Sequence, residues 1–352
     1  MNIDKRSFLI SLIENHWQRP RLCLSLLLTP LSWLFACISW LRRFLYRHHW
    51  LKTTHHSVPI IVVGNIHAGG TGKTPIVVAI VKKLQEKGMK VAVISRGFAR
   101  KQNSVHLIAN QDRAQNVGDE PLLIMQRTGA PVCVGKQRNL AIKKLLQAYP
   151  DLDCIISDDG LQHYAMARDI ELIVFPISDL GKTLKQLPQG PLREPLSRLY
   201  QDQVRCVVSH ATHTPLTKPS SLKTLGKNTH IFYAIPRLGP IYLLNAPTHF
   251  IAPDFFRSKS GLAACAISKG QRFFSSLHEL GIVPKEKMIQ TDHSILPLPS
   301  LASRYDYVII TEKDAVKFKE AKFNNVFVLS YSADIEESLI NDLVNTVKAF
   351  HG

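Results

Sequence analysis

An apolar run followed by a glycine-rich stretch is the feature that most constrains the fold of this chain. The run is Val58-Pro-Ile-Ile-Val-Val63, and Gly69-Gly-Thr-Gly-Lys-Thr-Pro75 follows after a short connection. Glycines allow positive φ values, so successive backbone N–H groups can point at one ligand. The lysine and threonine stand where a helix begins, and a helix N-terminus favours an anion. The stretch therefore predicts a strand, a phosphate-binding loop and a helix.

The loop departs from the usual pattern G-x-x-x-x-G-K-[ST] at one position, because His67 stands where the first glycine belongs. The physical requirements survive this change. Lys73 can reach the β- and γ-phosphates of a nucleotide, and the Thr74 hydroxyl can bind Mg²⁺. We therefore predict that ATP and Mg²⁺ bind here, with these loop residues holding the nucleotide: Gly69, Gly70, Thr71, Gly72, Lys73 and Thr74.

Beyond residue 57, short apolar runs alternate with helical patterns. The alternation predicts an α/β fold whose parallel sheet is covered on both faces, typical of phosphate-loop NTPases. We assign residues 58–228 to this domain. Residues 231–244 contain two short strand-like pieces, which predict a two-stranded connector over 229–245. A smaller α/β domain with a C-terminal helix is expected over 246–352.

The N-terminal segment, residues 1–57, contains an uncharged apolar stretch from Leu22 to Leu41. As a helix it would be about 30 Å long, the thickness of the hydrocarbon layer. Pro30 interrupts it, and arginines flank both ends, so the charge pattern does not orient it. A single membrane span, a helix lying in one leaflet and a buried core helix all remain open. Tryptophans suited to a membrane interface stand at positions 17, 33, 40 and 50.

Composition limits the partners. The chain has 352 residues and a formal net charge of +17, from 44 basic and 27 acidic residues. This excess favours a polyanion, either nucleic acid, an anionic membrane surface or a phosphorylated substrate. Nucleic acid is disfavoured because no aromatic-interleaved basic module is found. The six cysteines show no CxxC pair, so we expect reduced core thiols and no zinc site.

A second group of candidate residues follows a later apolar strand in the sequence CIISDDGLQH, residues 154–163. Asp158 and Asp159 would lie at the carboxyl end of that strand, where a Mg²⁺-binding carboxylate belongs. Gln162 and His163 are expected beside the nucleotide phosphates. A turn capped by Asp and Gly is the structural alternative, and the sequence does not decide which aspartate meets the metal.

Further candidates each have an ordinary structural alternative. Asp119 either begins a helix or acts as a general base near the γ-phosphate, with His293 as its partner. In the proline-fixed loop 190–195, Arg193 suits a phosphate and Glu194 suits a metal shell. Thr311-Glu-Lys-Asp314 is expected to begin a helix as a cap, and base recognition by Lys313 and Asp314 is the functional alternative.

Taken together, these motifs resemble the tetraacyldisaccharide 4′-kinase family of lipid A synthesis in Gram-negative bacteria. The matching stretches occur in the family's order over residues 58–317: VPIIVVGNIHAGGTGKTP (58–75), SRGF (95–98), GDEPLL (118–123), DDGLQH (158–163), GPLREP (190–195), RFF (272–274), TDHS (291–294) and TEKDAVK (311–317). The sequence departs from the family at Leu161, where phenylalanine is usual, and over 266–270, which is usually richer in glycine.

The resemblance implies transfer of the γ-phosphoryl group of ATP to the 4′-hydroxyl of a tetraacylated glucosamine disaccharide 1-phosphate, which forms lipid IVA. It also implies an inner-membrane enzyme with its active site on the cytoplasmic face, and no stable protein partner. By motif, the expected catalytic residues are Asp119, His293, Lys73 and Arg193, and the expected metal residues are Thr74, Asp158, Asp159 and Glu194.

A membrane-associated regulatory ATPase of the partitioning type is the alternative. Such switches carry a second lysine early in the loop, where this chain has Ala68. A metallochaperone NTPase would need clustered cysteines, and the sequence has none.

Overall fold

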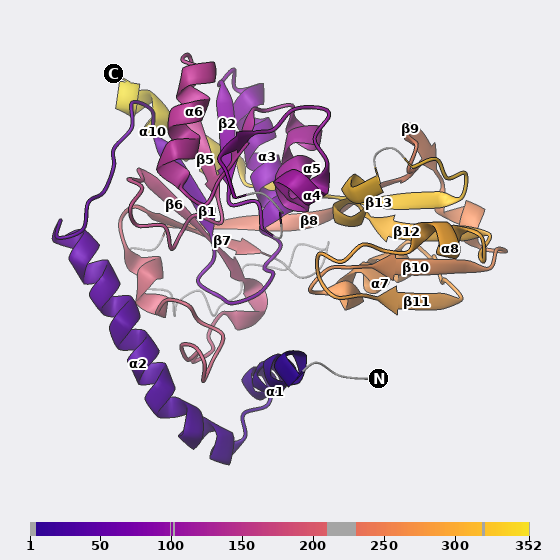
Figure 1. The fold of residues 1–352 in the computed structure, drawn as a ribbon, viewed down its shortest axis with the longest axis horizontal. Coiled ribbons are helices and arrows are strands. Elements are labelled where there is room, and N and C mark those ends of the chain that lie inside the picture. Colours follow the sequence, from indigo (N-terminus) through magenta and orange to yellow (C-terminus); the bar gives the residue numbers. More distant parts are fainter. Residues whose placement is uncertain (1–4, 99, 101–102, 210–229, 319–320, 352) are drawn as a thin grey trace.

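One mixed sheet runs the length of the molecule (Figure 1). The computed structural model describes residues 5–98, 100, 103–209, 230–318 and 321–351. Its thirteen described strands are β1 (Ile60–Gly64), β2 (Val91–Ser95), β3 (His106–Leu107), β4 (Val132–Val134), β5 (Cys154–Asp158), β6 (Ile170–Pro176), β7 (Val204–Ser209), β8 (His230–Leu243), β9 (Ala246–Ile251), β10 (Gly261–Cys265), β11 (Glu286–Ile289), β12 (Tyr307–Thr311) and β13 (Val326–Ile335). They lie in the order β11-β10-β12-β13-β8-β7-β6-β1-β5-β2-β4-β3, and β9 pairs with β8.

The helices of the described residues are α1 (Lys5–Gln18), α2 (Leu22–Arg47), α3 (Lys73–Glu86), α4 (Ala114–Val117), α5 (Asp119–Thr128), α6 (Arg138–Ala148), α7 (Gly270–Glu279), α8 (Leu298–Ala302), α9 (Glu312–Ala315) and α10 (Glu337–His351). Short 3₁₀ turns occur at Ile177–Asp179, Leu196–Tyr200, Pro253–Phe256 and Val316–Phe318. The predicted α/β class, with a phosphate loop and an apolar N-terminal helix, is confirmed.

In the first half of the sheet, strands β4, β2, β5, β1, β6 and β7 are parallel neighbours. Strand β1 lies in the middle, and all its residues are buried. Ile61 and Val63 face a core shared with α3 and α5, whereas Ile60 and Val62 face the core of α6. Both faces of β1 are covered, which explains its uninterrupted apolar sequence.

The connector differs from the expected hairpin, because residues 230–243 form the single strand β8. Its first part pairs with β7, and its second part pairs antiparallel with β13, from Ala234–Ile335 to Leu243–Phe327. Among the described strands, β13 is the partner of the residues between Ala234 and Ile241.

The second half of the sheet joins β10, β11 and β12 in parallel, with α7 on one face and α8 on the other. The C-terminal helix does not belong to this half as the sequence suggested. Leu339, Ile340 and Leu343 of α10 pack into the core of the first half, against α3. The chain thus crosses to the second half along β8 and returns along β13 (Figure 1).

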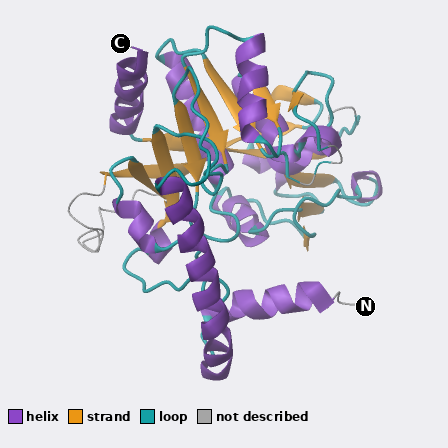
Figure 2. Cartoon of the chain, turned by 60° about the vertical axis from the view of Figure 1, so that its left-hand side comes forward, coloured by secondary structure: helices purple, strands orange, loops and turns teal. Residues whose placement is uncertain are grey.

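Helix α2 projects from the body and carries α1 at its far end (Figure 2). Leu22 is 80% exposed and Leu27 is 69% exposed. The buried-core alternative is therefore wrong. Among the described helices, α2 alone has the length and apolar composition needed to cross a membrane. Its two cysteines are exposed, so the expectation that every cysteine is a core thiol fails for Cys23 and Cys37.

Candidate active site

The predicted phosphate loop lies between the carboxyl end of β1 and the start of α3 at Lys73. Gly69 has φ +91° and Gly72 has φ +77°, conformations that side chains rarely allow. Asn65 Nδ2 donates to the Gly69 carbonyl oxygen at 3.2 Å and to Thr71 Oγ1 at 3.0 Å. The loop is therefore held open by its own residues, with the N-terminus of α3 facing any bound phosphate.

Three side chains gather beside this loop at the carboxyl edge of the sheet. Lys73 Nζ lies 3.2 Å from Asp159 Oδ1, and Ser95 Oγ donates to Asp158 Oδ2 at 3.1 Å. Asp159 has φ +50°, an unusual conformation for a residue other than glycine, so the turn after β5 is strained. Of the two aspartates that the sequence placed together, Asp159 contacts the lysine of the loop and Asp158 accepts from Ser95.

Their charges suit a divalent cation. Burial raises the pKa of Asp158 well above the usual carboxyl value, and nearby Glu120 and Asp159 raise it further. Burial also raises the pKa of Asp159, but Lys73 and Arg193 outweigh this effect and lower it. The buried Asp158 carboxylate thus lacks sufficient positive charge nearby, which bound Mg²⁺ would supply. No described group of three His, Cys, Asp or Glu side chains forms a metal site alone. Mg²⁺ suits this case, because it often takes one or two carboxylates plus waters and substrate phosphates.

Asp119 and His293 meet across the two halves of the molecule. His293 Nδ1 lies 3.0 and 2.9 Å from the two carboxylate oxygens of Asp119. Asp119 begins α5 and is 5% exposed, whereas His293 lies in a turn of the second half with φ +66°. Burial raises the pKa of Asp119, but the hydrogen bond from His293 and the charges of Lys313 and Lys317 outweigh it. The carboxyl group is therefore ionised and ready to accept a proton.

Two lysines of the segment 311–317 complete this pair, and the sequence analysis gave neither a catalytic role. Lys313 Nζ lies 2.9 Å from Glu120 Oε1, 3.1 Å from Asp292 Oδ1 and 3.4 Å from His293 Nε2. The buried Lys317 Nζ lies 3.8 Å from Asp119 Oδ2. Thr311 caps α9 as predicted. The sequence feature that could have indicated these contacts is the pair of lysines that follows the predicted helix cap.

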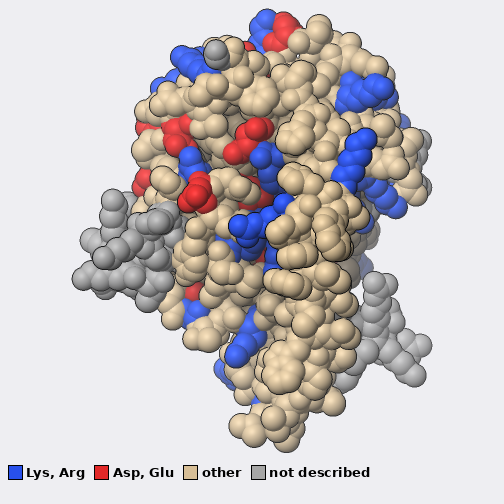
Figure 3. All heavy atoms as spheres, turned by 90° about the vertical axis from the view of Figure 1, so that its left-hand side faces the viewer, with Lys and Arg blue, Asp and Glu red and all other residues tan. Residues whose placement is uncertain are grey.

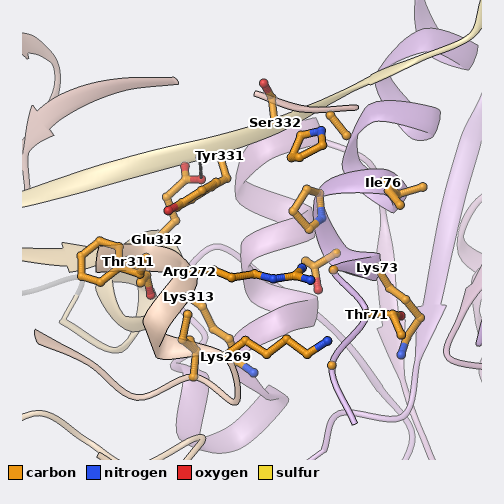
Figure 4. A pocket seen from close by; sticks show the side chains of 18 of the residues that line it. Thr71, Lys73, Ile76, Lys269, Arg272, Thr311, Glu312, Lys313, Tyr331 and Ser332 are labelled. Atoms are coloured by element: carbon orange, nitrogen blue, oxygen red, sulfur yellow. Dashed lines mark hydrogen bonds between the residues drawn. The ribbon is translucent and has the colours of Figure 1, made fainter. Parts of the chain in front are cut away.

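A cavity of about 520 Å³ lies between the halves, bounded by the phosphate loop on one side. Figure 4 shows Lys269 and Arg272 extending across it from the second half toward Thr71 and Lys73. Residues 266–270, where the sequence differs from the family, approach the phosphate loop closely. A Cβ added at Gly70 would lie 2.5 Å from Ser268 Oγ. Sequence reasoning assigned no role to Lys269 or Arg272, because only the tertiary structure brings them to the loop.

Other predicted residues lie outside the cavity lining. Gln162 Nε2 donates to Glu194 Oε1 at 2.9 Å. Glu194 Oε2 accepts from Tyr164 and Arg198, each at 2.7 Å, so protein donors occupy both its oxygens. Burial and nearby arginines lower the pKa of His163 to about 4, which leaves its imidazole neutral at physiological pH.

Comparison with known proteins agrees with these motifs. The family model for tetraacyldisaccharide-1-P 4′-kinase matches residues 24–348. A tetraacyldisaccharide 4′-kinase of Neisseria meningitidis serogroup B is 46% identical over 332 residues, covering 94% of this chain and 93% of that protein. One of Dechloromonas aromatica is 36% identical over 340 residues, covering 96% of this chain and 97% of that protein.

A solved structure shares the architecture. It is the crystal structure of the "apo" form of LpxK from Aquifex aeolicus in complex with ATP. The similarity has a TM-score of 0.73 at 25% identity, covering 93% of this chain and 99% of that chain. The resemblance found in the motifs is thus confirmed over almost the full length, and the chain belongs to the tetraacyldisaccharide-1-phosphate 4′-kinase family.

Proposed function

We propose that this protein transfers the γ-phosphoryl group of ATP to the 4′-hydroxyl of a tetraacylated glucosamine disaccharide 1-phosphate, forming lipid IVA. The observation that carries the proposal is the contact between Asp119 and His293, next to Lys313, which lines the same cavity as the phosphate loop. A kinase acting on an alcohol needs such a base, because the hydroxyl loses its proton as it attacks phosphorus.

The residues divide the reaction between them. Lys73, Arg193 and the loop N–H groups hold the β- and γ-phosphates in line with the acceptor oxygen. As the new O–P bond forms and the bond to the β-phosphate oxygen breaks, Asp119 accepts the hydroxyl proton. His293 donates through Nδ1 to Asp119 while its Nε2 faces Lys313, which orients the carboxylate.

Mg²⁺ fits the charge of this site, with Thr74, Asp158 and Asp159 as its proposed protein residues. When bound, the ion would neutralise charge that develops on the phosphate oxygens. Glu194, which the sequence placed with the metal residues, instead supports Gln162 in this proposal, because protein donors occupy its oxygens. Gln162 and His163 would lie beside the phosphates.

The membrane supplies the acceptor in this proposal. Acyl chains stay in the bilayer while the sugar reaches the site, which we place on the cytoplasmic face of the bacterial inner membrane. The exposed apolar surface of α2 supports attachment to the membrane. Figure 3 shows the side of the molecule from which α2 projects. The projecting part carries few charged side chains, whereas lysine and arginine side chains gather above it. Nucleic acid and stable protein partners play no part.

The direct test is incubation of the purified protein with labelled ATP, Mg²⁺ and the disaccharide 1-phosphate in mixed micelles. We expect one labelled product, the 1,4′-bisphosphorylated lipid. ATP consumption with no labelled glycolipid would refute the proposal and favour a regulatory ATPase.

A further inference from the structure

Helix α2, here called the anchor helix (Leu22–Arg47), contacts the body of the protein through specific polar groups. Ser32 Oγ donates to the Gln186 carbonyl oxygen at 2.8 Å. Gln189 Nε2 donates to Thr29 Oγ1 at 2.9 Å. Ser32 and Leu28 are the buried positions of this exposed helix. The anchor helix is therefore fastened to the turn formed by residues 186–189.

That turn continues directly into the approach to the phosphate loop. The Ala68 N–H donates to the Pro191 carbonyl oxygen at 2.7 Å. The Arg193 N–H donates to the Ile66 carbonyl oxygen at 2.6 Å. Residues 191–193 thus lie against the segment between β1 and the glycines, and few residues separate the anchor helix from the phosphate loop.

A second contact of the anchor helix lies near its C-terminal end, at Tyr164. The Arg42 guanidinium lies 5.6 Å from the centre of the Tyr164 ring, and the Tyr46 ring lies 5.8 Å away. The Tyr164 hydroxyl donates to Glu194 Oε2 at 2.7 Å, and Gln162 donates to the other oxygen of Glu194. A chain of direct contacts therefore connects the anchor helix to the DDGLQH segment.

The remainder of this chain of contacts is a buried ionic network. Arg198 donates to Glu194 through Nε and to both oxygens of Glu171 through Nη2, at 2.9 and 2.7 Å. Glu194 and Glu171 are each 1% exposed, and Arg198 is 4% exposed. Arg168 Nη1 donates both to Glu171 Oε1 and to the Leu161 carbonyl oxygen. A fully satisfied network of buried charges resists movement, so it can fix the loop that it contacts.

We propose that Tyr164 is a positioning residue that acts through Glu194 on Gln162 and the Asp158–Asp159 turn, and that docking of the anchor helix on Tyr164 supports the catalytic geometry. This inference rests on the proposed phosphoryl transfer. Small displacements of positioning groups cost large factors in rate. The anchor helix then contributes to turnover as well as to membrane attachment.

Tyr164→Phe is the first test, because it removes only the hydroxyl and keeps the ring under Arg42. With phosphatidylethanolamine/phosphatidylglycerol vesicles that contain the acceptor, we expect kcat to fall about tenfold. KM for ATP and sedimentation with vesicles should stay as in the wild type. Tyr149→Phe, at a tyrosine 37% exposed on the end of α6, is the matched control and should retain wild-type kcat.

A double-mutant cycle tests the route. If Tyr164 acts through Glu194, adding Tyr164→Phe to Glu194→Gln lowers kcat little further. The pair Arg42→Gln and Tyr46→Leu, on the anchor helix, should lower kcat about threefold or more while vesicle sedimentation is retained. This pair also decides the question if Tyr164→Phe does not fold.

Unchanged kcat in both Tyr164→Phe and the anchor-helix pair would overturn the inference. Multiplicative effects of Tyr164→Phe and Glu194→Gln would overturn the route through Glu194. A wild-type protein that fails to phosphorylate the disaccharide would refute the proposed function instead, so the two failures are distinguishable.

Discussion

At the scale of single residues, Asp119 carries the most specific chemistry. It is buried, ionised and bound by His293 from the other half of the molecule. We expect Asp119→Asn to lower kcat by about 10²- to 10⁴-fold, because the amide cannot accept the proton. The dissociation constant for ATP should change little. Glu86→Gln, at an exposed acid of α3, is the control. Wild-type turnover in Asp119→Asn would exclude it as the base.

Lys313 affects the pH dependence of the same carboxylate. Its ammonium group lowers the pKa of Asp119, so Lys313→Met should raise that pKa. Asp119 would then be protonated at higher pH than in the wild type. The acid limb of the kcat/KM profile should therefore move to higher pH, whereas Lys83→Met on the exposed face of α3 should leave it in place. An unmoved limb would show that Asp119 does not control it.

At the scale of elements, α2 presents leucines that no other described part of the protein covers. Leu27, Leu31 and Leu34 are 69%, 53% and 58% exposed. Replacing all three by serine should weaken vesicle association by about 3 kcal/mol, roughly a hundredfold in partition coefficient, because each leucine contributes about 1 kcal/mol when half-buried in lipid. The melting temperature of this triple variant should stay as in the wild type. Leu140→Ser, 50% exposed on α6, should bind vesicles as the wild type does. If the triple variant partitions onto vesicles as strongly as the wild type, another surface attaches the protein to the membrane.

At the scale of the whole molecule, β8 and β13 join two halves that share one cavity and several ion pairs. Arg127 of α5 pairs with Glu312 of α9, and Lys313 pairs with Glu120. The cavity beside the phosphate loop is therefore lined by residues from both halves, which are far apart in the sequence. Binding of one ligand by both halves stabilises their closed arrangement.

The thermal shift with ATP tests this shared site. At 100 times Kd, ATP should add about 2.7 kcal/mol of stability to the wild-type protein. At the same ATP concentration, Arg272→Ala in the second half should reduce the shift, as Lys73→Ala does in the first, because both side chains line the cavity. Arg257→Ala, at an exposed arginine of the second half, should leave the shift unchanged. A full shift in Arg272→Ala would show that the second half does not bind the nucleotide.

Local rules were enough for most of the elements and for the glycine-rich loop. Alternating apolar runs predicted the parallel sheet, and glycines before Lys73 predicted the phosphate loop, because both depend on contacts between residues near in sequence. The motifs also predicted the pairing of Asp119 with His293, since the family resemblance supplied a contact that spacing cannot.

What only the tertiary structure decided depends on contacts between distant segments. The chain returns along β13, so α10 packs on the first half and residues 230–243 form one strand instead of a hairpin. Lys269 and Arg272 face the phosphate loop only because the halves close on each other. Tyr164 links α2 to Glu194 through side chains whose packing no local pattern encodes. The sequence by itself determined where the glycine-rich loop forms and which helix is apolar enough for lipid, because both depend on neighbouring residues. Long-range packing determined which distant side chains lie beside them.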